Sequence, residues 1–486
     1  MKVTREEIRD ALNELNPWWR GGRLGRVLPW RRAAYTELER WVLKPPAPRA
    51  VLLSGARQVG KTTLLIQLVD ELIKQGVPPG NILYATFDNP LLKLTDIDTV
   101  LKVWQQTVEL KPGLEYLFLD EAQFIKNRGT WVKHQVDFSP LRRIVFTGSA
   151  MPLLEEDPES GVGRWHTIKL TTLSFFEYLK LKQEDAKQKQ ALFALPHVVP
   201  VSNLQTLFDW RPADFAGVSL QAQGLAFHFH EFLLRGGFPQ TALVDDLSDA
   251  QRILRDDIID KALKRDMTAL FKVRRIVELE QLFIYLCRHD GGVVDISNLT
   301  KEMGVTRPTV QHYIDLLESA HLIYKLPPYG YGKEVLRGRY KVYLADAAIA
   351  PAVMLRGRAL LELPDQLGVA AETAVLKHLF ARYYEKNIQF SYWRDRKDRE
   401  VDLVADLEGQ VIPFEVKYRQ QIDLAKQLVG YKKFLEGRKV QRGYIVTRMF
   451  EDFGITSGMP VPTLKIPAAL LCYWLGQNEI KPTLSD

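Results

Sequence analysis

The sequence predicts an α/β protein that starts with a parallel sheet covered by helices and ends with a smaller mixed α/β region. Three observations lead to this class. Strand-like apolar runs alternate with helical stretches over residues 49–180, which is typical of a parallel sheet with crossover helices. Residues 181–270 are mostly helical and polar, and we interpret them as a lid or linker. Residues 271–338 and 339–486 then return to short helices and strands, so several domains are expected.

The first domain is predicted to contain five strands, and its first strand leads into a glycine-rich loop. The strands are expected at 50–54, 82–87, 116–120, 143–147 and 167–170. The loop fits the pattern G-x-x-x-x-G-K-[ST], and a helix from Thr62 to Ile73 follows it, because leucines repeat there at helical spacing. The residues expected to bind ATP are Gly55, Ala56, Arg57, Gln58, Val59, Gly60, Lys61, Thr62 and Thr63.

Strand, loop and helix in this order form a phosphate cradle. The backbone N–H groups of the loop point inward, and the helix N-terminus adds a positive dipole. Lys61 is expected to reach the β- and γ-phosphates, and Thr62 to offer its hydroxyl to Mg²⁺. A glycine-rich turn with an exposed lysine is the alternative, and we disfavour it because the strand–loop–helix context is present.

Two further strands of the first domain end in polar residues suited to hydrolysis. The run Tyr116–Leu119 ends in Asp120 and Glu121, beside the phosphate loop by our prediction. We assign Asp120 to Mg²⁺ and Glu121 to the attacking water, with a solvated acidic turn as the alternative. Ser149 follows another strand and is chosen as the sensor of the γ-phosphate, although a turn that merely needs small residues explains it equally well.

Composition limits the class of protein. The chain has 486 residues, of which 46% are hydrophobic and 26% charged, which is typical of a globular protein. The only two cysteines, Cys287 and Cys472, exclude a disulfide framework and a cysteine-rich zinc site. No signal peptide and no membrane-spanning run are found, so we expect a cytoplasmic protein without a membrane partner. A formal charge of +7 permits a nucleic-acid partner without proving one.

Residues 1–48 are predicted to form an N-terminal arm. Tryptophans stand beside basic residues in this arm, at Trp18, Trp19 and Trp30. They can stack on bases, or they can pack on the following domain or a neighbouring subunit, and we favour packing because glycine and proline here suggest an anchored segment.

Residues 271–338 carry the pattern of a winged helix-turn-helix. A short helix is expected over Ile296–Met303, and a second helix begins after Thr306 and continues to Leu317. Leu322–Leu326 is expected to be the first strand of a wing. Winged helices bind DNA but also dock proteins, and both alternatives stay open. The side chains that would read DNA are Arg307, Thr309, Gln311 and His312.

A second chemical site is predicted in residues 339–486. Two strands, Glu400–Val404 and Phe414–Lys417, form a hairpin whose alternation places Asp402 on the face opposite its apolar neighbours and puts Glu415 and Lys417 together. Glu372, on a helix expected from Ala370 to Tyr383, can add a carboxylate. Carboxylates with an ammonium suit a divalent metal that activates water, but an amphipathic hairpin with a solvated charged face has the same spacing.

With these motifs in order, the chain resembles prokaryotic ATPases that join an AAA-like P-loop domain to the C-terminal domain called DUF4143. The resemblance covers nearly the whole chain and rests on the phosphate loop and on several short motifs. These motifs are Leu119-Asp120-Glu121-Ala122-Gln123, Thr147-Gly148-Ser149-Ala150, Gly236-Gly237-Phe238-Pro239, Tyr392-Trp393-Arg394, Glu400-Val401-Asp402 and Glu415-Val416-Lys417.

The resemblance implies a ring-forming P-loop ATPase whose C-terminal region, after a winged helix, has a PD-(D/E)xK nuclease-like fold. It implies that Arg164 acts as an arginine finger on a neighbouring subunit, with a surface arginine as the alternative. It also favours a nuclease-like site made of Glu372, Asp402, Glu415 and Lys417, without showing that the site cuts.

The function predicted from the sequence is that of an oligomeric, Mg²⁺-dependent ATPase that binds and remodels DNA, branched or broken DNA in the first place. We expect a homo-oligomeric ring, with a hexamer as one candidate size, and leave nuclease activity open. The competing hypothesis is a nucleotide-controlled signalling switch whose C-terminal domains dock a protein.

Overall fold

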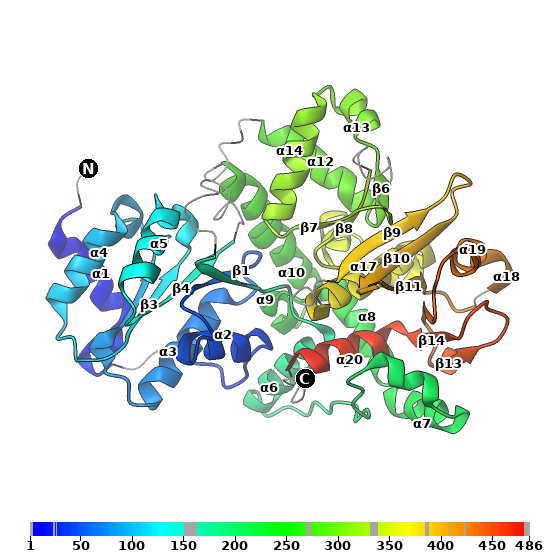
Figure 1. Cartoon of the computed structure of the whole chain (residues 1–486), viewed down its shortest axis with the longest axis horizontal. Coiled ribbons are helices and arrows are strands. Elements are labelled where there is room, and N and C mark those ends of the chain that lie inside the picture. The colour runs from blue at the N-terminus through cyan, green and yellow to red at the C-terminus, as the bar shows by residue number, and fades with distance from the viewer. Residues whose placement is uncertain are drawn as a thin grey trace. The chain divides into compact units, whose positions relative to one another are not determined.

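The computed structural model describes residues 3–22, 25, 27–149, 163–268, 273, 275–330, 339–383, 388–407, 409–421 and 424–480. The chain divides into two compact units (Figure 1). Unit 1 comprises Met1–Leu170 with Ser319–His321, and unit 2 comprises Thr171–Glu318 with Leu322–Asp486.

Unit 1 is built on a parallel sheet. In the part of the chain that the structure describes, this sheet has five strands in the order β2-β3-β4-β1-β5, and every pairing is parallel. The α/β class predicted for this part is confirmed, with strand ends that differ by one or two residues from those expected. The strands are β1 (Ala50–Ser54), β2 (Ile82–Thr86), β3 (Glu115–Asp120), β4 (Arg142–Gly148) and β5 (Trp165–Lys169).

Helices flank this sheet because apolar residues repeat along one side of each helix. Alternate residues of β1 to β4, such as Leu52, Leu83, Leu117 and Phe146, share one buried cluster with α1, α4 and α5. Helix α3 follows the glycine-rich loop and buries Leu64, Leu65, Leu68 and Leu72, the leucines whose spacing predicted it. The helices are α1 (Arg5–Leu15), α2 (Ala34–Leu43), α3 (Lys61–Lys74), α4 (Ile97–Thr107) and α5 (Arg128–Phe138).

The tryptophans of the N-terminal arm lie against β2. The indole N–H groups of Trp18 and Trp19 both donate to the carbonyl oxygen of Ile82, at 3.2 and 2.9 Å. Asn16 is buried, donates to the carbonyl oxygen of Tyr84 at 2.8 Å and accepts from its N–H at 2.7 Å. This part of the arm therefore packs on the sheet domain, which is the alternative that we favoured.

Unit 2 begins with helices, as expected for residues 181–270. Helix α6 starts at a capping box in which Ser174 and Glu177 exchange hydrogen bonds. Two short π-helical segments, Ile253–Ile259 and Ala262–Asp266, follow α10. The helices are α6 (Phe175–Gln188), α7 (Pro212–Ala222), α8 (Leu225–Arg235), α9 (Pro239–Leu243) and α10 (Leu247–Arg252).

A helical group with a small antiparallel sheet comes next. Its helices are α12 (Ile276–Arg288), α13 (Ile296–Met303) and α14 (Arg307–Ser319). Strands β6 (Gly292–Val294), β7 (Ile323–Leu326) and β8 (Tyr340–Leu344) pair in the order β6-β8-β7. Gly304, with φ 65°, ends α13 and makes the turn that the sequence indicates before α14.

The last part of unit 2 is a mixed sheet. Its order is β13-β14-β12-β11-β10-β9 in the described residues, with parallel pairs at β11–β12 and β12–β14 and antiparallel pairs elsewhere. The mixed α/β domain predicted after the parallel sheet is thus confirmed. The strands are β9 (Gln389–Arg394), β10 (Glu400–Leu407), β11 (Gln410–Lys417), β12 (Gly443–Thr447), β13 (Gly454–Thr456) and β14 (Thr463–Pro467).

Helices cover this mixed sheet. Tyr431 and Phe434 of α19 pack with Val401 and Val404 of β10 in one buried cluster. Helix α17 contacts β11 and α20, and it carries Glu372. The remaining helices are α16 (Ile349–Val353), α17 (Pro364–Tyr383), α18 (Leu424–Gln427), α19 (Val429–Gly437) and α20 (Ala468–Ile480).

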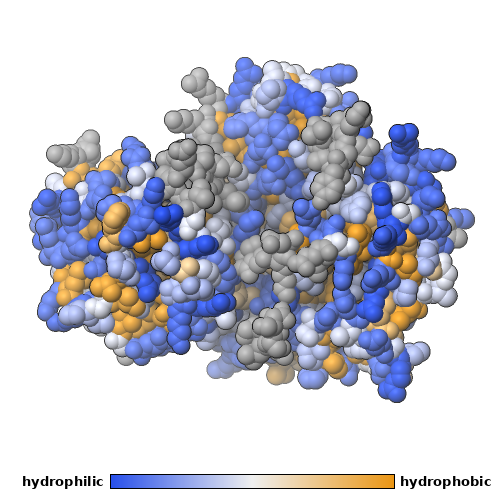
Figure 2. All heavy atoms as spheres, in the orientation of Figure 1, coloured by the Kyte–Doolittle hydropathy of each residue, from blue (hydrophilic) through white to orange (hydrophobic). Residues whose placement is uncertain are grey.

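Both cysteines, Cys287 and Cys472, are buried free thiols in unit 2. Hydrophilic side chains dominate the visible surface, with apolar areas scattered between them (Figure 2). Among the described helices, none combines the length and apolar character that crossing a membrane requires.

Candidate functional site

The glycine-rich loop is held between the ends of three strands. β1 lies between β4 and β5, so the chain leaving β1 at Gly55 passes close to the end of β5. A Cβ atom at position 55 would stand 2.2 Å from the carbonyl oxygen of Leu170, and only glycine fits there. Gly60, with φ 98°, is the N-cap of α3 and has no side chain to cap the first turn. The N–H groups of that turn are therefore left for an external acceptor.

Lys61 lies buried beneath this loop. Its Nζ donates to the carbonyl oxygens of Gly55 and Ala56, each at 2.8 Å. Arg32 crosses the loop from the N-terminal side and donates from Nη1 to the carbonyl oxygen of Val59 at 2.8 Å. These bonds fix the loop from within and from outside. Of the other loop residues, Arg57 is half-buried, whereas Gln58, Thr62 and Thr63 are exposed.

Asp120 stands at the end of β3 and meets the loop through Thr62. Thr62 donates from Oγ1 to Oδ2 of Asp120 at 2.7 Å, and the Tyr84 hydroxyl donates to the same oxygen at 2.9 Å. Thr147 donates to Oδ1. β4 lies between β3 and β1, so the strand of Asp120 does not pair with the strand that leads into the loop. The contact forms nevertheless, because the ends of parallel strands open on one edge of a sheet.

Glu121 and Ser149 are joined by a glutamine. Gln123 donates from Nε2 to a carboxylate oxygen of Glu121 and, at 3.1 Å, to the hydroxyl of Ser149. The backbone N–H of Glu121 donates to Oγ1 of Thr147 at 3.0 Å, and Glu121 has φ 54° in the left-handed region. The residues we chose for the water and for the sensor therefore share one hydrogen-bonding partner. Gln123 was not among our candidates, although it belongs to the motif that we quoted.

The pKa of Tyr84, which contacts Asp120, is shifted by burial and by the negative charge of that residue. Burial, followed by the carboxylate of Asp120, raises the pKa of the Tyr84 hydroxyl well above its ordinary value. Tyr84 consequently stays protonated and acts as a hydrogen-bond donor to Asp120 throughout the physiological pH range.

Arg164, the predicted arginine finger, forms an ion pair with an acidic residue of α5. Its guanidinium pairs with Asp137 of α5, with Nε and Nη2 at 3.1 and 3.2 Å from the two carboxylate oxygens. The side chain is 38% exposed. Arg164 ends the sequence Gly161-Val162-Gly163-Arg164, a Gly-Arg element of the family that the chain resembles, and residues 161 and 162 lie outside the described residues. The role assigned to Arg164 stays a prediction.

The four side chains chosen on α14 are not equivalent. Arg307 and His312 are exposed, while Thr309 and Gln311 are half-buried. Gln311 donates from Nε2 to Asp315 at 3.0 Å, and the hydroxyl of Thr309 is 2.8 Å from that of Thr306. A DNA-reading role of these residues is not tested by the structure.

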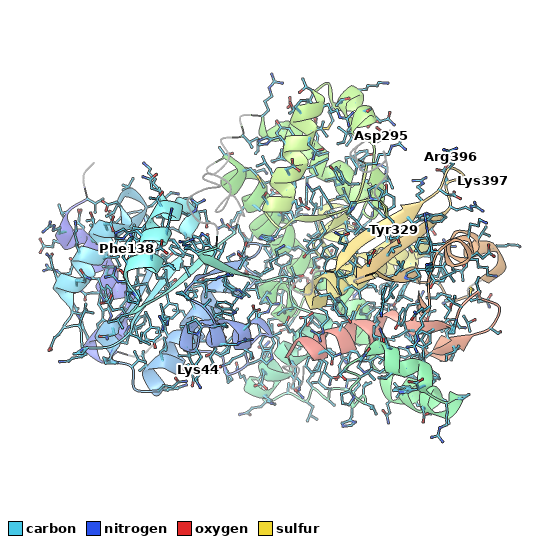
Figure 3. All side chains as sticks on the ribbon, viewed as in Figure 1. Lys44, Phe138, Asp295, Tyr329, Arg396 and Lys397 are labelled. Carbon is cyan, nitrogen blue, oxygen red and sulfur yellow. The ribbon has the colours of Figure 1, made fainter. Side chains whose placement is uncertain are left out.

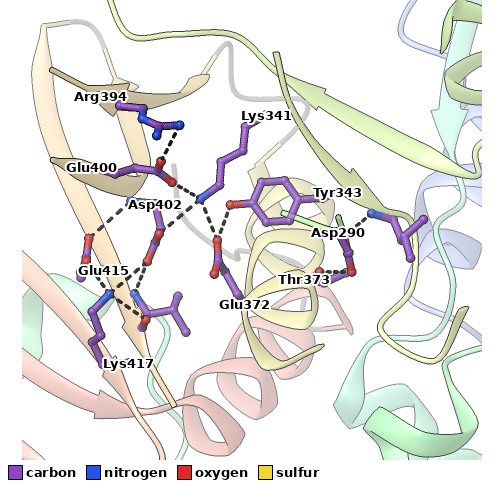
Figure 4. A network of polar contacts seen from close by, with 12 residues as sticks. Asp290, Lys341, Tyr343, Glu372, Thr373, Arg394, Glu400, Asp402, Glu415 and Lys417 are labelled. Atoms are coloured by element: carbon purple, nitrogen blue, oxygen red, sulfur yellow. Dashed lines mark hydrogen bonds and ion pairs between the residues drawn. The ribbon is translucent and has the colours of Figure 1, made fainter. Parts of the chain in front are cut away.

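The second predicted site is a buried polar cluster in unit 2 (Figure 4). Glu372, Asp402, Glu415 and Lys417, our four candidates, come together there from α17, β10 and β11. The backbone N–H of Val416 donates to Asp402 at 2.8 Å, and Lys417 pairs with Glu415 at 2.6 Å. A bulge between Val401 and Val404 interrupts the pairing of β10 with β9 beside Asp402.

The cluster also holds residues that we did not predict. Nζ of Lys341, on β8, lies 2.9 Å from Glu372, 2.7 Å from Glu400 and 3.2 Å from Asp402. The hydroxyl of Tyr343 donates to Glu372 at 2.5 Å. Period-two alternation in Tyr340-Lys341-Val342-Tyr343-Leu344 was a usable signal, because it places Lys341 and Tyr343 on one face of an otherwise apolar strand.

Charges in the cluster shift one another's pKa. Burial alone lowers the pKa of Lys341, but the carboxylates of Glu372, Asp402 and Glu400 outweigh it and hold that pKa well above its ordinary value. Burial also raises the pKa of Asp402, yet the ammonium groups of Lys341 and Lys417 outweigh burial and lower it. Burial and the charge of Asp402 raise the pKa of Glu415 to about 8. Lys341 is therefore a permanent cation among carboxylates of unequal acidity.

The donor set does not fit a metal in this cluster. In the described portion of the chain, no group of three or more His, Cys, Asp or Glu side chains could hold a metal ion. The space between Glu372, Glu400 and Asp402 is taken by the Lys341 ammonium.

Comparison with known proteins finds family models that match separate regions of the chain. The family model AAA_14, an AAA domain, matches residues 47–179, and DUF4143, a domain of unknown function, matches residues 367–466. A third model of unknown function, DUF8612, matches residues 226–361. The parallel sheet and the glycine-rich loop define the first domain as an AAA-type P-loop ATPase fold. The protein combines this AAA domain with a C-terminal DUF4143 domain, as the resemblance implied.

Relatives span several prokaryotes. An uncharacterised protein of Methanocaldococcus jannaschii is 23% identical over 410 residues, covering 83% of this chain and 82% of its own. Uncharacterised proteins of Haemophilus influenzae and Mycobacterium tuberculosis are 25% and 26% identical, covering 76% and 81% of this chain and 82% and 75% of their own.

The comparison with solved structures finds similarity at low TM-score to three proteins, among others. The ORC1 protein of Aeropyrum pernix, in complex with DNA, is 14% identical, with a TM-score of 0.32 and coverage of 68% of this chain and 94% of its own. RuvB of Thermotoga maritima is 17% identical, with a TM-score of 0.26 and coverage of 70% and 92%. DnaA of Aquifex aeolicus, bound to AMPPCP, is 15% identical, with a TM-score of 0.25 and coverage of 62% and 90%.

Proposed function

We propose that the protein is an ATP hydrolase that acts on DNA as an oligomer. The observation that carries the hydrolase is the 2.7 Å contact between the Thr62 hydroxyl and the buried carboxylate of Asp120. It joins the glycine-rich loop to the acidic strand end, the two parts that P-loop ATPases combine.

The roles of the residues follow from their positions. ATP would lie with its phosphates against the N–H groups of the loop and the first turn of α3. Lys61 would exchange its bonds to the carbonyl oxygens of Gly55 and Ala56 for phosphate oxygens. Glu121 would orient the attacking water, and Gln123 would link Glu121 to Ser149, the residue that would respond to the γ-phosphate.

Mg²⁺ fits the donor set at Thr62 and Asp120. A hydroxyl and a carboxylate 2.7 Å apart are the hard oxygen ligands that this ion takes. Held by Thr62 and Asp120, Mg²⁺ would supply positive charge that neutralises the negative charge developing during phosphoryl transfer. The protein's part is to hold Asp120 in place, through the hydroxyl groups of Tyr84 and Thr147.

DNA would be bound through unit 2. The order α12, β6, α13, α14, β7, β8 supports a winged helix, in which α14 would be the second helix of the helix-turn-helix pair. Arg307 and His312 are the exposed candidates on it. Arg396 and Lys397, at the tip of the β9–β10 hairpin, point into solvent and suit a phosphate backbone (Figure 3). Both regions are expected to contribute to binding that weakens with salt.

Oligomerisation is the third part of the proposal. Arg164 would leave Asp137 and reach the nucleotide of a neighbouring subunit in a homo-oligomeric ring. An arginine finger is typically worth roughly 10³–10⁵ in rate, so an isolated subunit would hydrolyse ATP slowly.

The deciding experiment measures phosphate release with and without single-stranded, duplex and four-way DNA. Wild type is expected to be stimulated by DNA, and Lys61→Ala to lose at least about a hundredfold in rate, because the charge that meets the phosphates is gone. Lys74→Ala is the matched control. Lys74 lies on the same helix, is 65% exposed and pairs with Asp70, so its loss leaves turnover unchanged.

DNA binding is tested through charge. Arg307→Ala and the pair Arg396→Ala/Lys397→Ala are expected to weaken DNA binding and to reduce its salt dependence by about one counter-ion for each charge removed. Lys187→Ala on α6, an exposed lysine paired with Glu184, is the control.

A signalling switch is the second candidate function, and one observation favours it. Gln311 and Thr309 already bond to Asp315 and Thr306, which leaves fewer side chains on α14 to read bases and suits protein docking. ATP turnover that ignores every form of DNA, while Lys61→Ala still abolishes it, would select this function.

A further inference from the structure

The resemblance to PD-(D/E)xK nucleases implies a divalent metal at the carboxylates of unit 2. The structure disagrees with that expectation at one residue. Lys341 enters the cluster from β8, outside the motif, and its side chain is only 3% exposed. Its ammonium has three N–H groups, and the cluster offers one carboxylate to each: Glu372, Glu400 and Asp402 at 2.9, 2.7 and 3.2 Å.

These distances are those of N–H···O hydrogen bonds between ions. Mg²⁺ would need oxygen ligands at about 2.0–2.1 Å in octahedral geometry, at the same point between the carboxylates. An ion that entered would have to expel a buried ammonium whose three bonds are all made inside the cluster. Expulsion would leave that charge buried and unpaired, which is strongly unfavourable.

The other charged residues of the cluster also form hydrogen bonds or ion pairs with one another and with the backbone. Lys417, the lysine that a nuclease would need beside the reacting phosphate, pairs with Glu415 at 2.6 Å. One carboxylate oxygen of Asp402 accepts from the N–H of Val416 at 2.8 Å, and the other faces Lys341. Glu400 also lies 4.0 Å from Arg394.

We propose that Lys341 is the resident cation of this cluster in place of a divalent metal, and that the DUF4143 domain neither binds a metal there nor cleaves a phosphodiester. The ammonium instead joins three elements, because β8 belongs to the three-stranded sheet, Glu372 to α17, and Glu400 and Asp402 to the six-stranded sheet (Figure 4). This assignment does not depend on the ATP site, so either one can fail alone.

Mn²⁺ binding tests the proposal on the full-length protein without nucleotide. Free Mn²⁺ is counted by electron paramagnetic resonance with wild type and Asp402→Asn, so that binding at Thr62 and Asp120 is common to both. We expect the same number of bound ions in the two proteins. One additional Mn²⁺ in wild type, or Mn²⁺-dependent DNA cleavage that Asp402→Asn loses, would overturn the proposal.

Lys341→Met supplies the positive arm. This substitution removes the ammonium and leaves the carboxylates of Glu372, Glu400 and Asp402 around an apolar side chain. We expect Lys341→Met to bind one Mn²⁺ more than wild type, and Lys341→Met/Asp402→Asn not to bind this additional ion. Thermal unfolding with and without Mn²⁺ is a second measurement of this binding, because Lys341→Met should gain more stability from the ion than wild type or Lys341→Met/Asp402→Asn. A folded Lys341→Met protein that binds no additional Mn²⁺ would contradict the proposal, and the comparison of wild type with Asp402→Asn decides even if Lys341→Met does not fold.

Discussion

Single atoms decide the shape of the phosphate loop. The hydrogen at Gly55 in place of a Cβ lets the end of β1 pass the carbonyl oxygen of Leu170, and the φ of 98° at Gly60 opens the first turn of α3. Lys61, held by two carbonyl oxygens of the same loop, then lies under the place where phosphates would bind. The two glycines and the lysine of the motif thus determine the backbone conformation of the loop, and this conformation is what phosphate binding would require.

Gly55→Ala tests that shape. The added Cβ would stand 2.2 Å from a backbone oxygen that cannot rotate away, so the strand ends must separate. We expect the free energy of unfolding to fall by about 1–3 kcal/mol, as in other overpacked sites. Denaturant unfolding measures it. Gly217→Ala is the control: position 217 lies within α7 with nothing within 4 Å, and the exchange should stabilise the protein by up to about 1 kcal/mol. Equal stability of wild type and Gly55→Ala would contradict the argument.

Sequence reasoning performs differently for neighbouring residues of the ATP site. Motif spacing identifies Lys61, Thr62 and Asp120, since each has a fixed place relative to a strand end. Gln123 was missed because nothing in the sequence says that its amide would span Glu121 and Ser149, which come from different strands.

At the scale of elements, alternation along strands explains the buried cluster of unit 2. Lys341 and Tyr343 share one face of β8, and Asp402 points away from its apolar neighbours on β10, as predicted from the period of two. The partner strand could not be predicted, because β8 and β10 belong to different sheets. A lysine inside an apolar strand signals a buried ion pair but does not name its carboxylates.

Lys341→Met is expected to destabilise the protein by about 3–5 kcal/mol, because removing one partner of a buried ion pair leaves uncompensated charge. Replacing the acid as well, in Lys341→Met/Glu372→Gln, should recover part of that loss. Denaturant unfolding without metal provides the measurement. Lys187→Met, whose lysine is 63% exposed and 2.6 Å from Glu184, should cost no more than about 1 kcal/mol. Similar losses for the two lysines would show that the cluster is not a buried ionic link.

A second buried acid, Asp290, joins α17 to β8 and gives a pH dependence. Leu344 donates its N–H to Oδ1 and Thr373 its hydroxyl to Oδ2, both at 2.8 Å. Burial, with a smaller contribution from the charge of Glu372, raises the pKa of Asp290 to about 7. Above pH 3.8, the ordinary pKa of an aspartate, the unfolded chain releases this proton. The folded protein keeps the proton on Asp290 up to about pH 7.

The contribution of Asp290 to the free energy of unfolding should consequently fall as the pH rises from about 4 to about 7. Asp290→Asn has no titrating proton; its Oδ1 can still accept from the N–H of Leu344, and its Nδ2 can donate to the hydroxyl of Thr373. Between about pH 4 and 7 the free energy of unfolding of this protein should therefore fall less, or rise more, than that of wild type. Glu372, whose pKa burial also raises, contributes with the same sign and remains; the neighbouring thiol of Cys287 has its pKa raised far above this window. Unfolding by denaturant across this pH range measures the slopes, with the exposed Asp249→Asn as control. Identical slopes for wild type and Asp290→Asn would refute the assignment.

At the scale of the whole molecule, the order of motifs predicted more than any one of them. The parallel sheet, the helical stretch and the mixed sheet follow one another as the sequence indicated, because each has its own hydrophobic period and turn residues. The predicted boundaries at 48, 180, 270 and 338 remain predictions. Contacts divide the described chain at Leu170 into two units, and the helices after that point share a core with the C-terminal sheet domain. Sequence periodicity cannot report which helices will share a core.

Substitutions at Arg164 test whether the ATP site is shared between subunits of an oligomer. If Arg164 serves a neighbouring subunit, Arg164→Ala and Lys61→Ala should each be nearly inactive, with a loss of roughly 10³ or more for the arginine. Mixed together, they should regain up to about one quarter of the wild-type rate, because an interface is active when one subunit offers an intact loop and its neighbour an intact arginine. Specific activity should also rise with protein concentration.

Asp137→Ala separates this role from a structural one. It removes a carboxylate that Arg164 contacts within its own chain, at 3.1 and 3.2 Å, and keeps the arginine itself. Turnover should be retained or increased, since the surface pair contributes at most about 1 kcal/mol to folding. If Asp137→Ala is as inactive as Arg164→Ala, the pair matters as a structural contact in one chain. If the mixture of Arg164→Ala and Lys61→Ala stays inactive while each protein still assembles, the arginine does not act between subunits, and each subunit must complete its own ATP site.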